Sequence, residues 1–178
     1  LFHVSLLYNL VLRHEQRRPW WSHIEPLLLL GALPLREKQH LVQLTKDEGV
    51  RTIVTMNQPY ELLPNLLATP ITPQDWLDAG VVQCFGATND FSPPTIETIH
   101  RCVEFIHTQV DLLEKTTYVH CKAGRGRSTV VVVAFLVQHR ALSLEDAIAF
   151  TRAKRPHVSL SPKQRTVLTA FCQAYERH

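Results

Sequence analysis

The most informative part of this 178-residue chain reads His120-Cys121-Lys122-Ala123-Gly124-Arg125-Gly126-Arg127-Ser128. It sets a cysteine six positions ahead of an arginine, with small residues between them. Residues 116–119 before it are rich in β-forming residues, and residues 130–136 after it predict a buried helix. A strand, a glycine loop and a helix in this order predict a phosphate-binding loop, because backbone N–H groups and the positive helix end both attract an anion.

Cys121 is predicted to be the nucleophile of this loop. A field that attracts a phosphate dianion also favours thiolate over thiol, and it can lower a cysteine pKa from about 8.5 to roughly 3.5–7.5. Arg127 offers a planar fork to two phosphoryl oxygens and can follow them into the transition state. Cys121 and Arg127 are therefore predicted to be catalytic. The residues predicted to bind phosphate are Lys122, Ala123, Gly124, Arg125, Gly126 and Arg127.

Two neighbours of the loop are predicted to support the thiolate. His120 is expected to donate to the loop, a role compatible with that of a hydrogen-bonded core histidine. The Ser128 hydroxyl either bonds the thiolate or caps the following helix. The remaining cysteines, Cys84, Cys102 and Cys172, are expected to be inert core residues.

The chemistry also needs a carboxylic acid, because thiolate attack on a phosphate monoester expels a poor alkoxide leaving group. Asp90 is predicted for this role, since it follows a predicted strand in a loop stiffened by two prolines. Asp90 could instead cap a helix, although Ser92 lies closer to the helix start. Asp75 and Asp78 are weaker candidates because both fall on a predicted short helix.

Predicted strands and helices alternate along the chain. The strands cover residues 27–30, 51–55, 81–85 and the residues up to His120. The helices cover residues 36–48, 72–79, 95–113 and 128–139, and two more begin at Ser143 and Ser161. This alternation predicts an α/β fold with a mostly parallel central sheet flanked by helices. Such sheets bind ligands beyond the carboxyl ends of their strands, where Cys121 is placed.

The composition is that of one ordinary globular domain, with 45% apolar and 20% charged residues. The four cysteines form no C-x-x-C pair, which argues against a disulfide framework or structural zinc. The ten histidines show no H-x-H or H-x-x-x-H spacing, so we expect no metal and no organic cofactor. A net charge of +3 is too small to predict nucleic-acid binding, and we expect a monomer.

These motifs identify the chain as similar to the cysteine-dependent protein tyrosine phosphatase superfamily, in its dual-specificity branch. Further segments, 6–8, 21–26, 29–36, 53–57 and 60–61, resemble the mitochondrial phosphatidylglycerophosphate phosphatases. We expect a phosphatase domain over residues 27–178, preceded by an N-terminal helix and lead-in over residues 1–26. The resemblance implies a lipid substrate on the route to cardiolipin and a mitochondrial location, with the cytoplasm or a plastid as alternatives.

The loop charges favour an anionic phospholipid as substrate. Lys122 and Arg125 add two cations beside Arg127, which suits a polyanionic head group better than a phosphotyrosine peptide. Tensin-like phosphoinositide phosphatases have a similarly basic loop. A phosphoinositide phosphatase, a dual-specificity protein phosphatase and a phosphate-binding module without turnover therefore remain alternatives.

Two segments outside the loop are open to two interpretations each. The resemblance makes Tyr60 and Glu61 candidate substrate contacts, although Gln58 and Pro59 replace the acidic residues of the family, and a structural loop is equally open. Residues 1–12 are apolar and precede cations and tryptophans, a pattern that suits peripheral membrane contact or packing on the domain itself.

Overall fold

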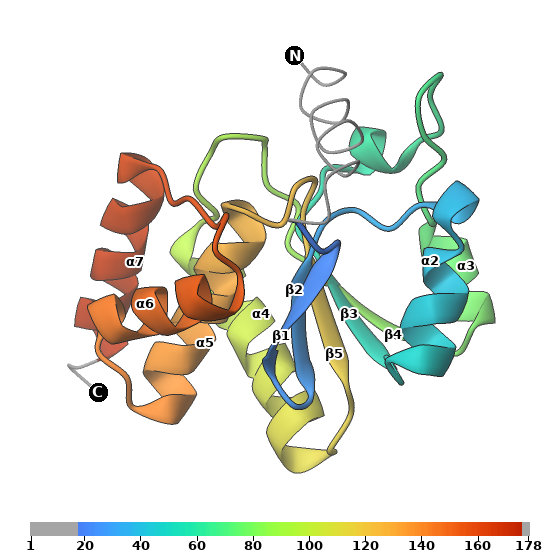
Figure 1. Cartoon of the computed structure of the whole chain (residues 1–178). Coiled ribbons are helices and arrows are strands. Elements are labelled where there is room, and N and C mark those ends of the chain that lie inside the picture. Colours follow the sequence, from blue (N-terminus) through green and yellow to red (C-terminus); the bar gives the residue numbers. More distant parts are fainter. Residues whose placement is uncertain (1–17, 176–178) are drawn as a thin grey trace.

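The computed structural model describes residues 18–175, which form a five-stranded sheet with helices on both faces (Figure 1). The strands are β1 (Trp21–Glu25), β2 (Leu28–Gly31), β3 (Thr52–Thr55), β4 (Val82–Phe85) and β5 (Thr117–His120). They lie in the order β1-β2-β5-β3-β4, in which only β1 and β2 pair antiparallel. The predicted α/β fold with a mostly parallel central sheet is therefore confirmed.

The helices form two unequal layers. The larger layer holds α4 (Ile96–His107), its continuation η5 (Thr108–Leu112), α5 (Arg127–Arg140), α6 (Leu144–Lys154) and α7 (Pro162–Tyr175). The smaller layer holds α2 (His40–Val42), η3 (Gln43–Asp47) and α3 (Pro73–Asp78). Two 3₁₀ turns, η2 (Arg36–Lys38) and η4 (Pro59–Leu62), complete the elements. Within residues 18–175, no helix has the length and apolar character needed to span a bilayer.

Helix α5 is the centre of the larger layer. Residues 130–136 are fully buried, as expected for a helix that is apolar on all sides. The helix packs against the sheet and against α4, α6 and α7. Because α5 begins at Arg127 directly after the loop that leaves β5, this packing fixes the predicted phosphate-binding loop at the carboxyl edge of the sheet.

Two local predictions differ from the structure. The helix predicted over residues 36–48 is wrong as one element, because Gln39 has a left-handed φ of 57° that separates η2 from α2. Strand β1 is not among the predicted strands, although it lies in the predicted lead-in and shifts register between His23 and Glu25. Its only β-branched residue is Ile24, so its β signal is weak. The predicted N-terminal helix lies outside the described residues.

A methyl group at Gly31 should destabilise the sheet next to the loop. A Cβ there would collide with Tyr118 Oη and lie 2.7 Å from the Trp20 carbonyl oxygen. We expect Gly31→Ala to lower the free energy of unfolding by about 1–3 kcal/mol, measured by urea denaturation. Gly80→Ala is the comparison variant. A Cβ at Gly80 meets nothing within 4 Å, so the change in its unfolding free energy reports only the cost of the positive φ at that position. Equal Tm and unfolding free energy for wild type and Gly31→Ala would contradict this account.

Candidate active site

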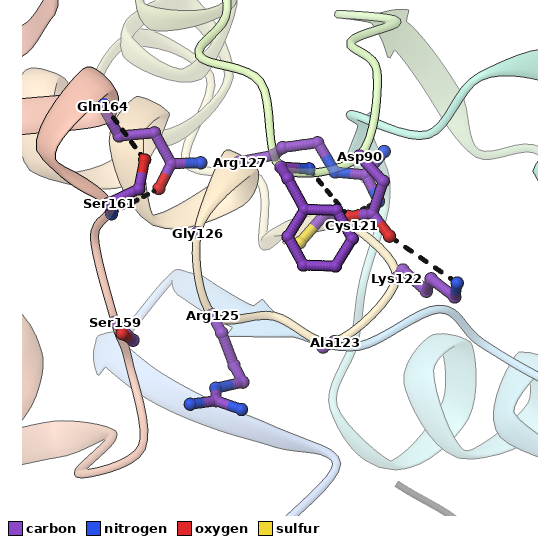
Figure 2. A pocket seen from close by; sticks show the side chains of 11 residues that line it. Asp90, Cys121, Lys122, Ala123, Arg125, Gly126, Arg127, Ser159, Ser161 and Gln164 are labelled. Carbon is purple, nitrogen blue, oxygen red and sulfur yellow. Dashed lines mark hydrogen bonds and ion pairs between the residues drawn. The ribbon is translucent and has the colours of Figure 1, made fainter. Parts of the chain in front are cut away.

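A cavity of about 300 Å³ opens at the carboxyl edge of the sheet (Figure 2). Its walls come from three segments: the loop between β5 and α5, the loop after β4, and the turn that leads into α7. The lining residues are Asp90, Phe91, Cys121, Lys122, Ala123, Arg125, Gly126, Arg127, Ser159, Ser161 and Gln164. The structure thus brings the predicted nucleophile, arginine and acid to one cavity.

Cys121 lies at the floor of this cavity with 3% of its surface exposed. Burial alone raises the pKa of the Cys121 thiol, but the Arg127 guanidinium and the Ser128 hydroxyl outweigh burial and lower that pKa below its ordinary value. The Ser128 hydroxyl donates to Cys121 Sγ over 3.2 Å. Backbone N–H groups of Arg125 and Ser128 contribute in the same direction. The site therefore enriches the nucleophilic thiolate.

Arg127 is buried and held from three sides. Its guanidinium donates to both carboxylate oxygens of Glu61, at 2.7 and 3.0 Å, and to the Thr88 carbonyl at 2.8 Å. Its Nη2 also lies 3.1 Å from Asp90 Oδ1. Burial opposes the charge on Arg127, but Glu61, the Cys121 thiolate and Asp90 raise the pKa of Arg127 above its ordinary value. The Arg127 guanidinium is therefore oriented before any phosphate binds.

Asp90 lies at the mouth of the cavity between two cations. Its side chain is 30% exposed, and its Oδ2 lies 3.6 Å from Lys122 Nζ while Oδ1 contacts Arg127. Lys122 itself is buried, which lowers its pKa, and Asp90 and Glu61 oppose this shift. Asp90 therefore lies close to the phosphate-binding loop while keeping access to solvent.

His120 is a neutral core histidine behind the loop. Its Nε2 lies 3.0 Å from Thr55 Oγ1 on the neighbouring strand, and its ring stacks on Tyr118. Burial is the main cause that lowers the pKa of His120 to about 3, with a smaller contribution from Arg127 and an opposing contact with the Cys121 backbone. His120 joins β3 to β5 just before the nucleophile.

Glu61 and Tyr60 are neighbours on the turn η4 but differ in burial. Glu61 is 1% exposed and sits behind Arg127, whereas Tyr60 is 59% exposed. Neither residue lines the cavity. The short turn holds Glu61 through a capping box, in which Glu61 Oε2 accepts from the Gln58 N–H at 2.8 Å. The geometry makes Glu61 a positioning residue for Arg127, in place of the substrate contact considered from the sequence.

Arg155 is a site residue that the sequence analysis missed. It lies between α6 and α7, is 1% exposed, and donates through Nε to the Gly124 carbonyl at 2.9 Å. Its guanidinium also donates to the carbonyls of Ala123, Pro19 and Trp20. Because the loop carbonyls turn back toward Arg155, the loop N–H groups are free to face the cavity. A buried arginine next to Pro156 carries no spacing signal that links it to the loop.

Arg125 and Gly124 show how the loop is shaped. Arg125 lines the cavity, and its Nε donates to the His157 carbonyl at 3.0 Å. Gly124 has a φ of 64°, and a Cβ there would collide with the Gly31 backbone. This position therefore requires glycine both for its backbone conformation and for the close approach of β2.

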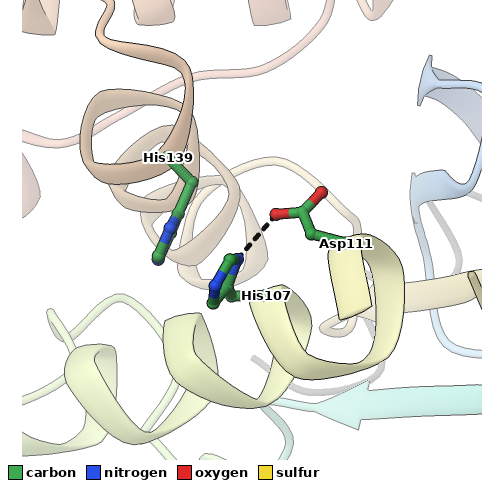
Figure 3. A group of neighbouring side chains, drawn as sticks. All are labelled: His107, Asp111 and His139. Atoms are coloured by element: carbon green, nitrogen blue, oxygen red, sulfur yellow. Dashed lines mark hydrogen bonds and ion pairs between the residues drawn. The ribbon is translucent and has the colours of Figure 1, made fainter. Parts of the chain in front are cut away.

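One group of metal-ligating residue types occurs within residues 18–175: His107, Asp111 and His139 (Figure 3). The Asp111 carboxylate is 2.7 Å from His107 Nδ1 and accepts from Arg140 at 2.6 and 3.2 Å. The two imidazole rings stack with centroids 4.0 Å apart. Burial raises the pKa of Asp111, but its bonds to Arg140 and His107 lower it overall. The cluster joins η5 to the end of α5 through an ion pair, which accounts for its geometry.

Comparison with known proteins places this arrangement in a family. The model of the dual specificity phosphatase catalytic domain matches residues 80–174. This chain belongs to the dual-specificity phosphatase family. The phosphatase is 40% identical over 180 residues to phosphatidylglycerophosphate phosphatase PTPMT2 of Arabidopsis thaliana, covering 96% of this chain and 71% of that protein. It is thus a cysteine-dependent phosphatase, as the sequence resemblance implied.

Two further relatives agree with this assignment. The phosphatase is 38% identical to phosphatidylglycerophosphatase and protein-tyrosine phosphatase 1 of Mus musculus, over 96% of this chain and 87% of that protein. A crystal structure of PTPMT1 in complex with PI(5)P superimposes with a TM-score of 0.79 at 37% identity, covering 89% of this chain and 98% of that chain.

Removing the Ser128 hydroxyl should make the Cys121 thiolate of the phosphatase less stable relative to the thiol. Ser128→Ala deletes a hydrogen bond to charged sulfur, so the pKa of Cys121 should rise and alkylation by iodoacetamide at mildly acidic pH should slow about tenfold. The control is Thr129→Val, because the neighbouring Thr129 hydroxyl is buried without a hydrogen-bond partner. An alkylation profile that shifts equally in both variants would contradict the assignment.

Neutralising Glu61 should affect both stability and catalysis. Glu61→Gln leaves the buried Arg127 without its bidentate carboxylate, so we expect a loss of about 3 kcal/mol in unfolding free energy. Turnover of a soluble aryl phosphate should fall as well, because the Arg127 guanidinium loses its orientation. Tyr60→Ala, at the exposed neighbour, should leave the unfolding free energy unchanged. Full stability of Glu61→Gln in urea would show that Glu61 does not anchor Arg127.

Proposed function

We propose that this phosphatase removes the terminal phosphate of phosphatidylglycerophosphate to give phosphatidylglycerol. The main support is similarity along almost the whole chain to proteins named for this reaction, at 40% and 38% identity. The cavity adds a second argument. A space of about 300 Å³ suits a phosphorylated glycerol head group and is too small for acyl chains as well.

The first step transfers the phosphoryl group to Cys121. The thiolate Sγ attacks phosphorus, an S–P bond forms, and the bond from phosphorus to the glycerol oxygen breaks. Arg127 and the loop N–H groups hold the three equatorial oxygens. Asp90 gives a proton to the departing glycerol oxygen. Phosphate oxygens compete with Asp90 for Arg127 Nη2, so substrate binding frees the carboxyl group to face the leaving oxygen.

The second step hydrolyses the phosphocysteine. Asp90, now a carboxylate, takes a proton from water as the water oxygen bonds to phosphorus. The S–P bond breaks and inorganic phosphate leaves. The Ser128 hydroxyl, 3.2 Å from Sγ, stabilises the thiolate that this step regenerates. The steps use the side chains of this chain and one water molecule.

A phosphoinositide is a second candidate substrate. The observation that favours it is the bound PI(5)P in the related structure of PTPMT1. Lys122 and Arg125 line the cavity beside Arg127, and this charge suits either lipid head group. The expected mitochondrial location stays a prediction, supported by the resemblance of the chain to mitochondrial enzymes.

A substrate panel tests the proposal. We expect kcat/KM to be highest for phosphatidylglycerophosphate, lower for PI(5)P and lowest for a phosphotyrosine peptide, measured as phosphate release from detergent-dispersed lipid. Cys121→Ser should abolish release from every substrate. A preference for the peptide would refute the lipid assignment.

The acid is tested separately. Asp90→Asn should lower kcat by roughly 10²- to 10⁴-fold on phosphatidylglycerophosphate. The loss should be smaller on an aryl phosphate, whose phenolate leaves without a proton. A uniform loss on both substrates would argue against Asp90 as proton donor.

A further inference from the structure

A short apolar hairpin projects from the active-site edge of the molecule. Asn65 and Ala68 pair across it, with the Asn65 N–H donating to the Ala68 carbonyl at 3.0 Å. Leu66 at its tip is fully exposed, and Leu63 is 62% exposed. Residues 62–73 contain no charged side chain. The tip therefore offers exposed aliphatic side chains with no charge among them, a surface suited to an apolar partner.

The hairpin is connected directly to the catalytic machinery. Leu63 follows Glu61 by two residues, and Glu61 bonds Arg127 from behind the cavity wall. At the hairpin base, Leu62 packs with Leu33, whose N–H donates to the carbonyl of Lys122 in the phosphate-binding loop. Figure 1 shows the segment projecting above α2 and α3, at the end of the molecule where the parallel strands end. The base of the hairpin is therefore fixed to the phosphate-binding loop.

A second exposed apolar side chain belongs to the mouth itself. Phe91 is 70% exposed, lines the cavity and follows Asp90, which contacts Arg127. It has a left-handed φ of 63°, a conformation that bulky residues rarely adopt. The loop thus holds a phenyl ring outward at the rim at some conformational cost.

We propose that the hairpin tip, Leu63 and Leu66, together with Phe91, inserts into the surface of a phospholipid bilayer and sets the cavity mouth against the head groups. The inference rests on the proposed lipid substrate. A cavity of about 300 Å³ leaves the acyl chains in the membrane, so the mouth must meet the membrane surface. The uncharged tip suits an acyl-chain environment, since a charge there would have to be desolvated.

The base of the hairpin rests against the turn η2, which carries charges of both signs. Arg36 donates through its backbone N–H to the Thr69 carbonyl, which places η2 against the returning arm of the hairpin. This turn carries the exposed side chain of Lys38. The charge behind the tip is balanced, because Asp75 pairs with Arg36 and Glu37 accepts from the Thr69 N–H beside Lys38, so the apolar tip itself carries the proposal.

Vesicle binding by the full chain tests the proposal. The double variant Leu63→Ser/Leu66→Ser should reduce co-sedimentation with phosphatidylcholine/phosphatidylglycerol vesicles by about tenfold or more, given the transfer energy of two leucines. Leu112→Ser is the matched control, because Leu112 is 65% exposed on η5, which leads into the opposite end of β5. Turnover of a soluble aryl phosphate should remain at the wild-type level in both variants. Leu66→Ser alone gives a second test, since that side chain is fully exposed.

The outcomes separate this surface from the proposed substrate. Weaker vesicle binding by the hairpin variants alone supports the surface, even if phosphatidylglycerophosphate proves not to be hydrolysed. Vesicle binding that is unchanged in the double variant, or equally reduced in Leu112→Ser, overturns the surface, even if detergent-dispersed phosphatidylglycerophosphate is hydrolysed well. Wild-type protein that fails to bind these vesicles also overturns it, and the hairpin would then be a protein contact.

Discussion

A buried guanidinium is the interaction on which this active site depends. Arg127 is 2% exposed, and removing its charge from water costs several kcal/mol unless well-placed partners replace the solvent. Glu61, the Thr88 carbonyl and Asp90 are those partners, and they come from the loops that follow β3 and β4. One side chain thus ties three neighbouring loops together, and the same charge stabilises the Cys121 thiolate.

A second buried arginine shapes the loop from behind. Arg155 donates hydrogen bonds to backbone carbonyls of the phosphate-binding loop and of residues 19 and 20, just before β1. Because the loop carbonyls are satisfied on this side, the N–H groups are directed to the other side, where an anion binds. Preorganised donors of this kind favour the charge of the transition state without reorganisation during the reaction.

The loops around Arg127 also link chemistry to the proposed membrane surface. The loop after β3 pairs the Glu61 carboxylate with Arg127 and leaves Leu63 exposed. The loop after β4 likewise pairs Asp90 with Arg127 and leaves Phe91 exposed. The ion pairs that orient the fork therefore hold the rim in place. In the proposed membrane contact, this coupling would set the depth at which the membrane surface meets the nucleophile.

Local spacing was enough to predict the strand, glycine loop and central helix around Cys121, because those residues are contiguous and their periodicity reports burial. The position of Asp90 after a strand end, in a loop with two prolines, singled it out as the candidate acid. The partners of the loop could not be predicted in this way. Glu61 meets Arg127 across 66 residues and Arg155 meets Gly124 across 31, and no sequence period encodes such contacts. Buried charges pair only when packing removes water from both groups. Tertiary structure therefore decided that Glu61 positions Arg127, that Arg155 supports the phosphate-binding loop and that the hairpin is exposed.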